Sequence, residues 1–256
     1  MAILLAVLIF LTACAERGGE KIADIPQEIP SQTETGDQPP EGEAAQPGMP
    51  ELALGLAQFA PVGPDDLIAV IETQMGTIRI RLFPEHAPLA VENFVGLAGE
   101  GFYNGSNFHR VINGFMIQTG AANRDGSGAT SIFRDEDGNP VPFADEFTVT
   151  LWHFRGALSM ANPGTRDSNM SQFFIVQDST ADLSQMQASQ YPEDVIERYL
   201  EVGGAQHLDW AHTVFGHVIE GMDVVDAIAG VETTGRPLDR PLEDVLILSV
   251  RIEQGE

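Results

Sequence analysis

One short stretch, residues 108–118, combines a cation, an apolar pair and an amide, namely Arg110, Phe115, Met116 and Gln118. An Asn-Gly pair at 113–114 lies between apolar runs and predicts a hairpin turn with a strand on either side. A hydrogen-bond donor beside an apolar patch can stabilise charge that shifts onto a carbonyl or a nitrogen in a water-poor pocket, without a nucleophile, metal or cofactor. Side chains alternate along a strand, so Phe115 and Met116 point to opposite faces unless the turn bends the chain.

Many short strands and few helices surround this hairpin. Residues 67–73 and 77–83 predict a second hairpin with one buried face. Further short strands are predicted at 147–151, 157–160, 172–176, 213–219 and 245–252. Helices are predicted over 87–98, which has a proline in its first turn, and over 222–229, which ends at a glycine. This pattern favours a mainly β domain built as an antiparallel barrel.

Three blocks of sequence carry a more specific signal. The first is 108–112 with 114–116 and Gln118, the second is 156–162 with 171–175, and the third is 208–209 with 212–216. In residue types and order the blocks resemble the cyclophilin-type peptidyl-prolyl isomerases, and the resemblance covers roughly Asp66 to Glu253. It implies a closed eight-stranded antiparallel barrel with a helix over each end. It also implies peptidyl-prolyl cis-trans isomerase activity on proline-containing polypeptides, with no cofactor and no metal.

The same resemblance gives roles to individual residues. Arg110 matches the catalytic cation, and Gln118 matches the residue that helps to orient the substrate carbonyl. The positions that line the proline pocket are Phe115, Met116, Phe174, Leu208 and His212. The positions along the groove for the residues before proline are Gly126, Ala161, Asn162 and Gln172. His207 also belongs to the binding set, but many family members carry a tryptophan there that contributes to cyclosporin binding, so we expect weak inhibition by that drug.

Other interpretations of these residues remain open. Without the three blocks, Phe115, Met116 and Phe174 would be core residues, and Arg110 would be a surface cation. A membrane-tethered module that binds or holds proline-containing chains without turnover would use the same groove, although the presence of both Arg110 and Gln118 favours an enzyme. A structural lipoprotein of the envelope would show neither activity nor peptide binding.

Composition limits the partners. With 38 acidic and 13 basic residues the chain of 256 residues carries a net charge of -25, and no cluster of Lys or Arg offers a phosphate-binding surface. Nucleic acid is therefore not an expected partner, and we expect a monomer. His207, His212 and His217 are spaced by five, which alternates faces on a strand and does not predict a metal site.

The amino-terminal quarter differs from the rest. Residues 2–11 form an apolar run too short to span a bilayer, and the run ends in Leu-Thr-Ala-Cys at 11–14, which resembles a bacterial lipobox. We therefore expect a lipoprotein signal peptide at 1–13, a lipidated Cys14, an acidic Pro/Gly/Gln-rich disordered tether at 14–64 and an isomerase domain at 65–256. This organisation predicts an extracytoplasmic protein anchored to a bacterial cell membrane. No basic residue precedes the apolar run, so a start further upstream stays open.

One segment interrupts the strand pattern. Residues 178–206 are longer than the family's usual connection, and 192–202 predict a helix that ends at Gly203 and Gly204. We interpret this segment as a helical surface insertion next to the active face, of unknown role.

Overall fold

The computed structural model describes residues 56–182, 184, 186 and 191–255. The expected signal peptide, Cys14 and most of the expected tether lie outside these residues. Within the described part of the chain, no helix has the length and apolar character needed to cross a bilayer.

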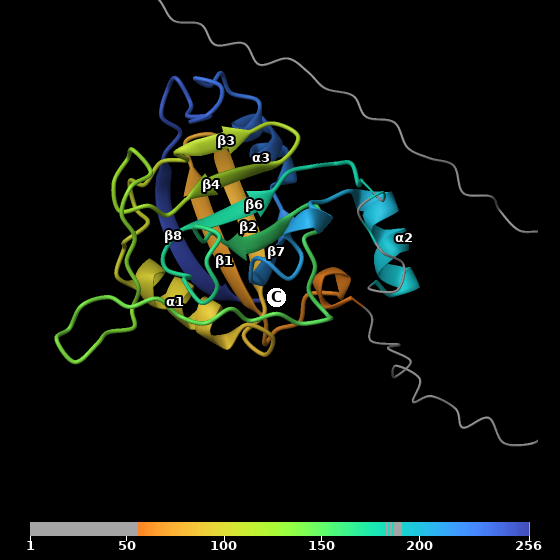
Figure 1. Ribbon diagram of the computed structural model, residues 1–256, viewed down its shortest axis with the longest axis horizontal. Coiled ribbons are helices and arrows are strands. Elements are labelled where there is room, and N and C mark those ends of the chain that lie inside the picture. Colours follow the sequence, from red (N-terminus) through yellow and green to blue (C-terminus); the bar gives the residue numbers. More distant parts are fainter. Residues whose placement is uncertain (1–55, 183, 185, 187–190, 256) are drawn as a thin grey trace, which may run out of the picture. The chain divides into compact units, whose positions relative to one another are not determined.

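Eight antiparallel strands form a single sheet. They are β1 (Leu67–Thr73), β2 (Gly76–Leu82), β3 (Arg110–Ile112), β4 (Met116–Thr119), β5 (Ala157–Met160), β6 (Phe173–Val176), β7 (Val214–Glu220) and β8 (Ile247–Gln254). Their order across the sheet is β3-β4-β6-β5-β7-β2-β1-β8. In the part of the chain that the structure describes, three α-helices accompany the sheet, namely α1 (Pro88–Gly99), α2 (Glu193–Val202) and α3 (Met222–Ala229). The fold is therefore mainly β, and α2 lies in the predicted insertion (Figure 1).

The sheet is a curled half-barrel, so the expected closed barrel is wrong. The edge strands β3 and β8 do not pair with each other along any part of their described length. The two edges meet only before β3 begins, at an isolated bridge between Asn107 and Leu246. Along β3 itself, the backbone N–H of Val111 donates instead to the carbonyl of Asp239, in the loop before β8, at 2.8 Å. Because β3 has three residues and a loop takes up its free edge, the hydrogen-bonded ladder does not close.

The prediction of a strand at 147–151 is also wrong. These residues form a turn and irregular backbone. The Thr148 hydroxyl accepts the backbone N–H of Thr150 at 3.3 Å and lies 2.8 Å from the Thr150 hydroxyl. Local bonds between threonine side chains and the backbone compete with a strand ladder, which explains why β-branched residues do not extend here.

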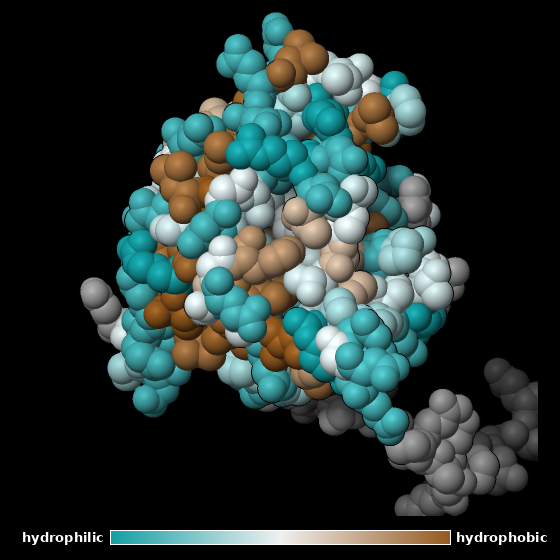
Figure 2. Space-filling view, turned by 90° about the vertical axis from the view of Figure 1, so that its left-hand side faces the viewer, coloured by the Kyte–Doolittle hydropathy of each residue, from teal (hydrophilic) through white to brown (hydrophobic). Residues whose placement is uncertain are grey.

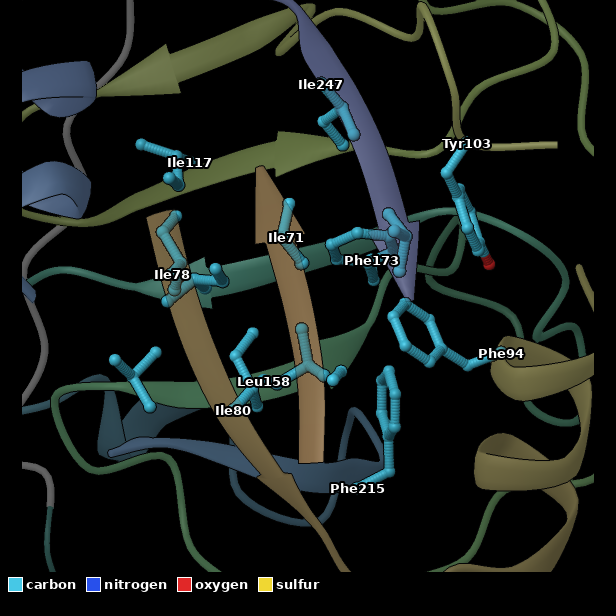
Figure 3. Packing of buried hydrophobic residues seen from close by; sticks show 14 of the residues in the cluster. Ile71, Ile78, Ile80, Phe94, Tyr103, Ile117, Leu158, Phe173, Phe215 and Ile247 are labelled. Atoms are coloured by element: carbon cyan, nitrogen blue, oxygen red, sulfur yellow. The ribbon is translucent and has the colours of Figure 1, made fainter. Parts of the chain in front are cut away.

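The interior of the half-barrel holds the main core. Isoleucines of β1 and β2 face Leu158 of β5 and Phe173 of β6, as Figure 3 shows. Phe94 of α1 packs edge-on against Phe173, with ring centroids 5.4 Å apart, and stacks on Tyr103 at 5.2 Å, so α1 closes one end of the curled sheet. On the surface, hydrophilic residues cover most of the face in Figure 2, with hydrophobic residues in separate patches between them.

A short segment before the expected domain start packs on the sheet. The 3-10 helix η1 (Ala57–Phe59) buries Gln58, whose side chain donates to the carbonyl of Trp152 at 2.9 Å and accepts the backbone N–H of Trp152 at 2.8 Å. The amide nitrogen of Gln58 also lies 3.1 Å from Nδ1 of His217 in β7. An amide nitrogen can only donate, so Nδ1 accepts and the His217 ring is neutral.

This buried histidine predicts acid sensitivity. Burial lowers the pKa of His217 to about 4 from its usual 6.5. Between these pKa values the unfolded chain binds a proton that the folded chain does not. The contribution of the neutral His217 to stability is therefore fully present above pH 6.5 and is lost progressively as the pH falls. From pH 7.5 to 5 we expect His217 to contribute a loss of about 2 kcal/mol in the free energy of unfolding. Urea unfolding at both pH values should show a correspondingly smaller loss in His217→Gln, and an equal loss would contradict this role.

Candidate active site

Strand register brings the predicted catalytic residues into one row. Arg110 of β3 lies opposite Gln118 of β4, and Gln118 lies opposite Phe174 of β6. Phe174 in turn lies opposite Ser159 of β5. Directly opposed residues share one face of a sheet. Because Ile117 points into the interior core, this row lies on the outer face of the curled sheet.

A chain of side-chain hydrogen bonds fixes this row. The guanidinium of Arg110 donates to Oε1 of Gln118 at 3.3 Å, and Nε2 of Gln118 donates to Oε1 of Gln172 at 3.0 Å. Nε2 of Gln172 donates to the carbonyls of Gly126 and Gly128, both at 3.2 Å. The half-buried Arg110 has five N–H donors, and within the described residues its side chain makes one hydrogen bond, the one to Gln118. Donors therefore remain for a ligand.

An apolar cluster adjoins the cation. Met116 and Phe174 are buried in it, and Phe115, Leu208 and Ala161 pack against it while partly exposed. Phe115 reaches the same side as Met116 because it belongs to the turn: its N–H donates to the Ile112 carbonyl at 3.1 Å, and β4 begins only at Met116. The turn therefore bends the chain and removes the conflict with strict alternation.

Two histidines complete the wall of this cluster. The ring of His212 stands edge-on to Phe174 at 5.5 Å, and its Nδ1 lies 3.0 Å from the carbonyl of Met160. The ring of His207 lies 5.4 Å from Phe115. Burial, and then the charge of His153, lower the pKa of both His207 and His212. Both rings are therefore neutral near pH 7, and the pocket they line remains apolar.

The site opens into a groove and a second hollow. The groove has a volume of about 510 Å³ and is lined by Gln118, Ala161, Asn162 and Gln172, among others. The hollow has a volume of about 700 Å³, and its lining includes Arg110, Phe115 and His207. Because the bonded pair Arg110 and Gln118 stands between them, an extended chain can pass from one to the other beside the cation.

The local backbone conformation explains why a glycine stands at position 126. Gly126 adopts φ +85°, a left-handed conformation that favours glycine, and a Cβ there would lie 2.7 Å from Cδ2 of His109. The close approach lets its carbonyl reach the Gln172 amide, so Gly126 shapes the groove through its backbone.

All the site residues expected from the sequence, apart from Cys14, lie in the described part of the chain, and they gather around this row. Asn162 lines the groove, but its side chain bonds within the protein, donating to the carbonyl of Ala211 at 3.2 Å. Sequence reasoning missed a buried pair behind the pocket, His153 and Asp209, whose facing atoms lie 2.8 Å apart. Asp209 directly follows Leu208 in the third block, which was the only signal for it. Within the described residues no three His, Cys, Asp or Glu side chains are grouped to hold a metal ion.

Comparison with known proteins agrees with this geometry. A family model described as cyclophilin type peptidyl-prolyl cis-trans isomerase/CLD matches residues 68–252. A candidate peptidyl-prolyl cis-trans isomerase of Staphylococcus saprophyticus is 42% identical over 191 residues, which cover 73% of this chain and 92% of that protein. A candidate bifunctional phosphatase/peptidyl-prolyl cis-trans isomerase of Streptococcus pyogenes is 44% identical over 186 residues, but the chain spans only 38% of that protein's length.

A solved structure is also similar. The crystal structure of a cyclophilin type peptidyl-prolyl cis-trans isomerase of Cryptosporidium parvum, in the presence of the dipeptide Ala-Pro, matches with a TM-score of 0.58 and 25% identity. The match covers 73% of this chain and 99% of that chain. The region matched by the family model extends from β1 to β8 and contains every element that carries the candidate site.

Proposed function

Because the chain belongs to the cyclophilin-type peptidyl-prolyl cis-trans isomerases, we propose that it isomerises X–Pro bonds of exported proteins at the outer face of a bacterial membrane. The observation that carries the chemistry is the bonded pair Arg110 and Gln118, at 3.3 Å, beside the apolar cluster of Met116 and Phe174. The location rests on the sequence around Cys14.

The chemistry needs a donor and a dry pocket. Rotation about a peptide bond crosses a barrier of about 18–20 kcal/mol because resonance gives the C–N bond double-bond character. As the bond twists, resonance is lost and the proline nitrogen becomes a better acceptor, so an N–H of Arg110 can stabilise the twisted form more than the planar one. Gln118 orients the substrate carbonyl, and the apolar cluster holds the proline ring. No bond breaks, so no nucleophile, metal or cofactor takes part.

The two hollows suggest an extended substrate. We assign the residues before proline to the groove along Ala161, Asn162 and Gln172, and the residues after proline to the hollow beside Phe115 and His207. The Cryptosporidium parvum relative was crystallised in the presence of Ala-Pro, which supports a proline-containing ligand for this fold. Unfolded or extended proline-containing polypeptides are therefore the proposed substrates.

The direct test follows isomerisation of a short proline peptide with the full-length chain. Uncatalysed exchange takes tens to hundreds of seconds, so acceleration is readily measured. Acceleration supports the enzyme. Peptide binding without acceleration would support the rival function, a tethered module that holds proline-containing chains.

Membrane attachment gives a separate prediction. We expect Cys14→Ser to move the full-length chain from the membrane fraction to the supernatant of a bacterial host, because attachment through acyl chains depends on that thiol. Ala15→Ser is the matched control and should stay with the membrane. Immunoblots of the two fractions measure this, and a Cys14→Ser protein that remains in the membrane would contradict lipidation at Cys14.

A further inference from the structure

The helical insertion reaches the pocket through a buried chain of hydrogen bonds. On α2, the hydroxyl of Tyr199 donates to Oδ2 of Asp209 at 2.8 Å. Oδ1 of Asp209 accepts the backbone N–H of His153 at 3.0 Å and lies 2.8 Å from Nδ1 of the same histidine. Nε2 of His153 lies 3.0 Å from Oγ of Ser159, on the outer face of β5. Four side chains therefore connect α2 to the sheet beneath the proline pocket.

Hydrogen-bond counting sets the charges in this chain. Oγ of Ser159 lies 3.0 Å from the carbonyl of Thr213, which can only accept, so the Ser159 proton is used there. Nε2 of His153 must then donate to Ser159. The one proton between Nδ1 and Oδ1 of Asp209 belongs to the histidine, because imidazole is the more basic group and the carboxylate already accepts from Tyr199 and the backbone. The His153 and Asp209 side chains are 2% and 3% exposed. They form a buried ion pair whose remaining polar atoms are satisfied, the condition for such a pair to be held in one geometry.

This ion pair touches both the floor and the wall of the pocket. The ring of His153 stacks on Phe174, with centroids 6.1 Å apart and planes at 15°, and stands edge-on to the ring of His212 at 6.5 Å. Asp209 directly follows Leu208, so a bond to its carboxylate also fixes the segment that carries the pocket's wall. Displacement of the pair would therefore shift Phe174, Leu208 and His212 relative to one another.

A hydrolytic role does not fit the same atoms. Asp209, His153 and Ser159 are connected in the order of a Ser-His-Asp triad. Ser159 is fully buried, however, and its proton is directed to the Thr213 carbonyl and not to the histidine. A nucleophile must reach substrate and pass its proton to the base, and this hydroxyl does neither.

We propose that the insertion positions the proline pocket, with Tyr199, Asp209 and His153 as positioning residues that act through Phe174, Leu208 and His212. The inference rests on the proposed isomerase function. Tyr199 is suited to this role because it is fully buried and its ring packs on Phe154, with centroids 4.4 Å apart, so α2 holds the hydroxyl in place. The insertion then sets the geometry in which a proline ring is held, although no residue of α2 is among the lining of the groove or the hollow.

The test removes one hydroxyl and keeps the ring. In the full-length chain we expect Tyr199→Phe to lower kcat/KM about five- to tenfold, since a charged acceptor loses one hydrogen bond. The loss should appear in affinity for a proline peptide, because the donor Arg110 is untouched. Val195→Ala is the matched control on α2: Val195 is 1% exposed and has no bond to Asp209. It should lower thermal stability at least as much as Tyr199→Phe while keeping the parent's activity and affinity.

A double variant tests whether Tyr199 and His153 act through the same series of hydrogen bonds. Coupled residues give non-additive effects, so Tyr199→Phe should add little to a protein that already carries His153→Asn. Three results would each overturn the positioning role. The first is a Tyr199→Phe protein with the parent's kcat/KM and peptide affinity. The others are fully additive losses of kcat/KM in the double variant, and a loss of kcat/KM in Val195→Ala equal to that in Tyr199→Phe. If the parent binds peptide without isomerising it, the proposed function fails, and peptide affinity in the same variants still judges the positioning role.

Discussion

Replacing Arg110 with alanine is expected to lower kcat/KM for prolyl isomerisation about 10²–10³-fold, the range seen when one positioned donor to a transition state is removed. Affinity for a proline peptide should stay within a few-fold of the parent. In the proposed mechanism the proline ring is held by the apolar cluster around Met116 and Phe174, to which Arg110 does not belong. The separation of rate from affinity is the signature of a group that acts mainly in the transition state.

The matched control is Arg251→Ala. Arg251 lies on β8, at the edge of the sheet opposite β3, and it is an exposed partner of Glu72 at 2.7 Å. The two variants each remove one guanidinium from a strand, and only Arg110→Ala should affect catalysis. Isomerisation of a short proline peptide, with a parallel binding titration, measures both quantities. Retention of the parent's rate by a folded Arg110→Ala protein would remove Arg110 from the mechanism.

The position of this cation could be predicted because local signals and register agree. The Asn-Gly pair at 113–114 places the turn, and the turn fixes which residues of β3 and β4 face each other. That is why Arg110 and Gln118 are found opposed, as a hairpin at this position requires. Predicted helices at 87–98 and 222–229 also match α1 and α3 to within one residue, because proline and glycine mark their ends.

The path of the sheet edges could not be predicted in the same way. Closure depends on whether β3 reaches β8, and the loop carbonyl of Asp239 competes for the N–H of Val111. Residues 147–151 have strand composition, yet hydroxyls of Thr148 and Thr150 bond locally. In both places the outcome is set by a competing partner that periodicity does not reveal.

The insertion shows the same limit at the site. The sequence shows its length and predicts its helix at 192–202, which the structure has at 193–202. The bond from Tyr199 to Asp209 joins an insertion helix to a loop, and the bond from Asp209 to His153 joins residues separated by 56 positions. No period or motif connects these residues, because their partnership depends on how the two segments pack.

Replacing Asp209 with alanine is expected to lower the free energy of unfolding by about 3–5 kcal/mol, since removal of one partner leaves a buried charge without compensation. The cost falls on His153, whose ring is enclosed between Phe174 and Ser159, and on Tyr199, whose hydroxyl loses its acceptor. Folded domains are stable by only about 5–15 kcal/mol, so this loss would remove a large part of the margin. Urea or thermal unfolding at pH 7.5 measures it.

Glu201→Ala is the exposed counterpart within the insertion. Glu201 pairs with Arg198 at 2.7 Å, but its side chain is 66% exposed, so the pair should contribute about 1 kcal/mol or less. A second comparison removes the charge as well as its partner: Asp209→Ala combined with His153→Leu should be less destabilised than Asp209→Ala alone, because no buried cation remains. A small loss in the single variant, or a larger loss in the double variant, would show that His153 and Asp209 are not a buried ion pair. If the double variant regains stability while kcat/KM stays low, the pair is kept for the geometry of the pocket and not for the stability of the fold.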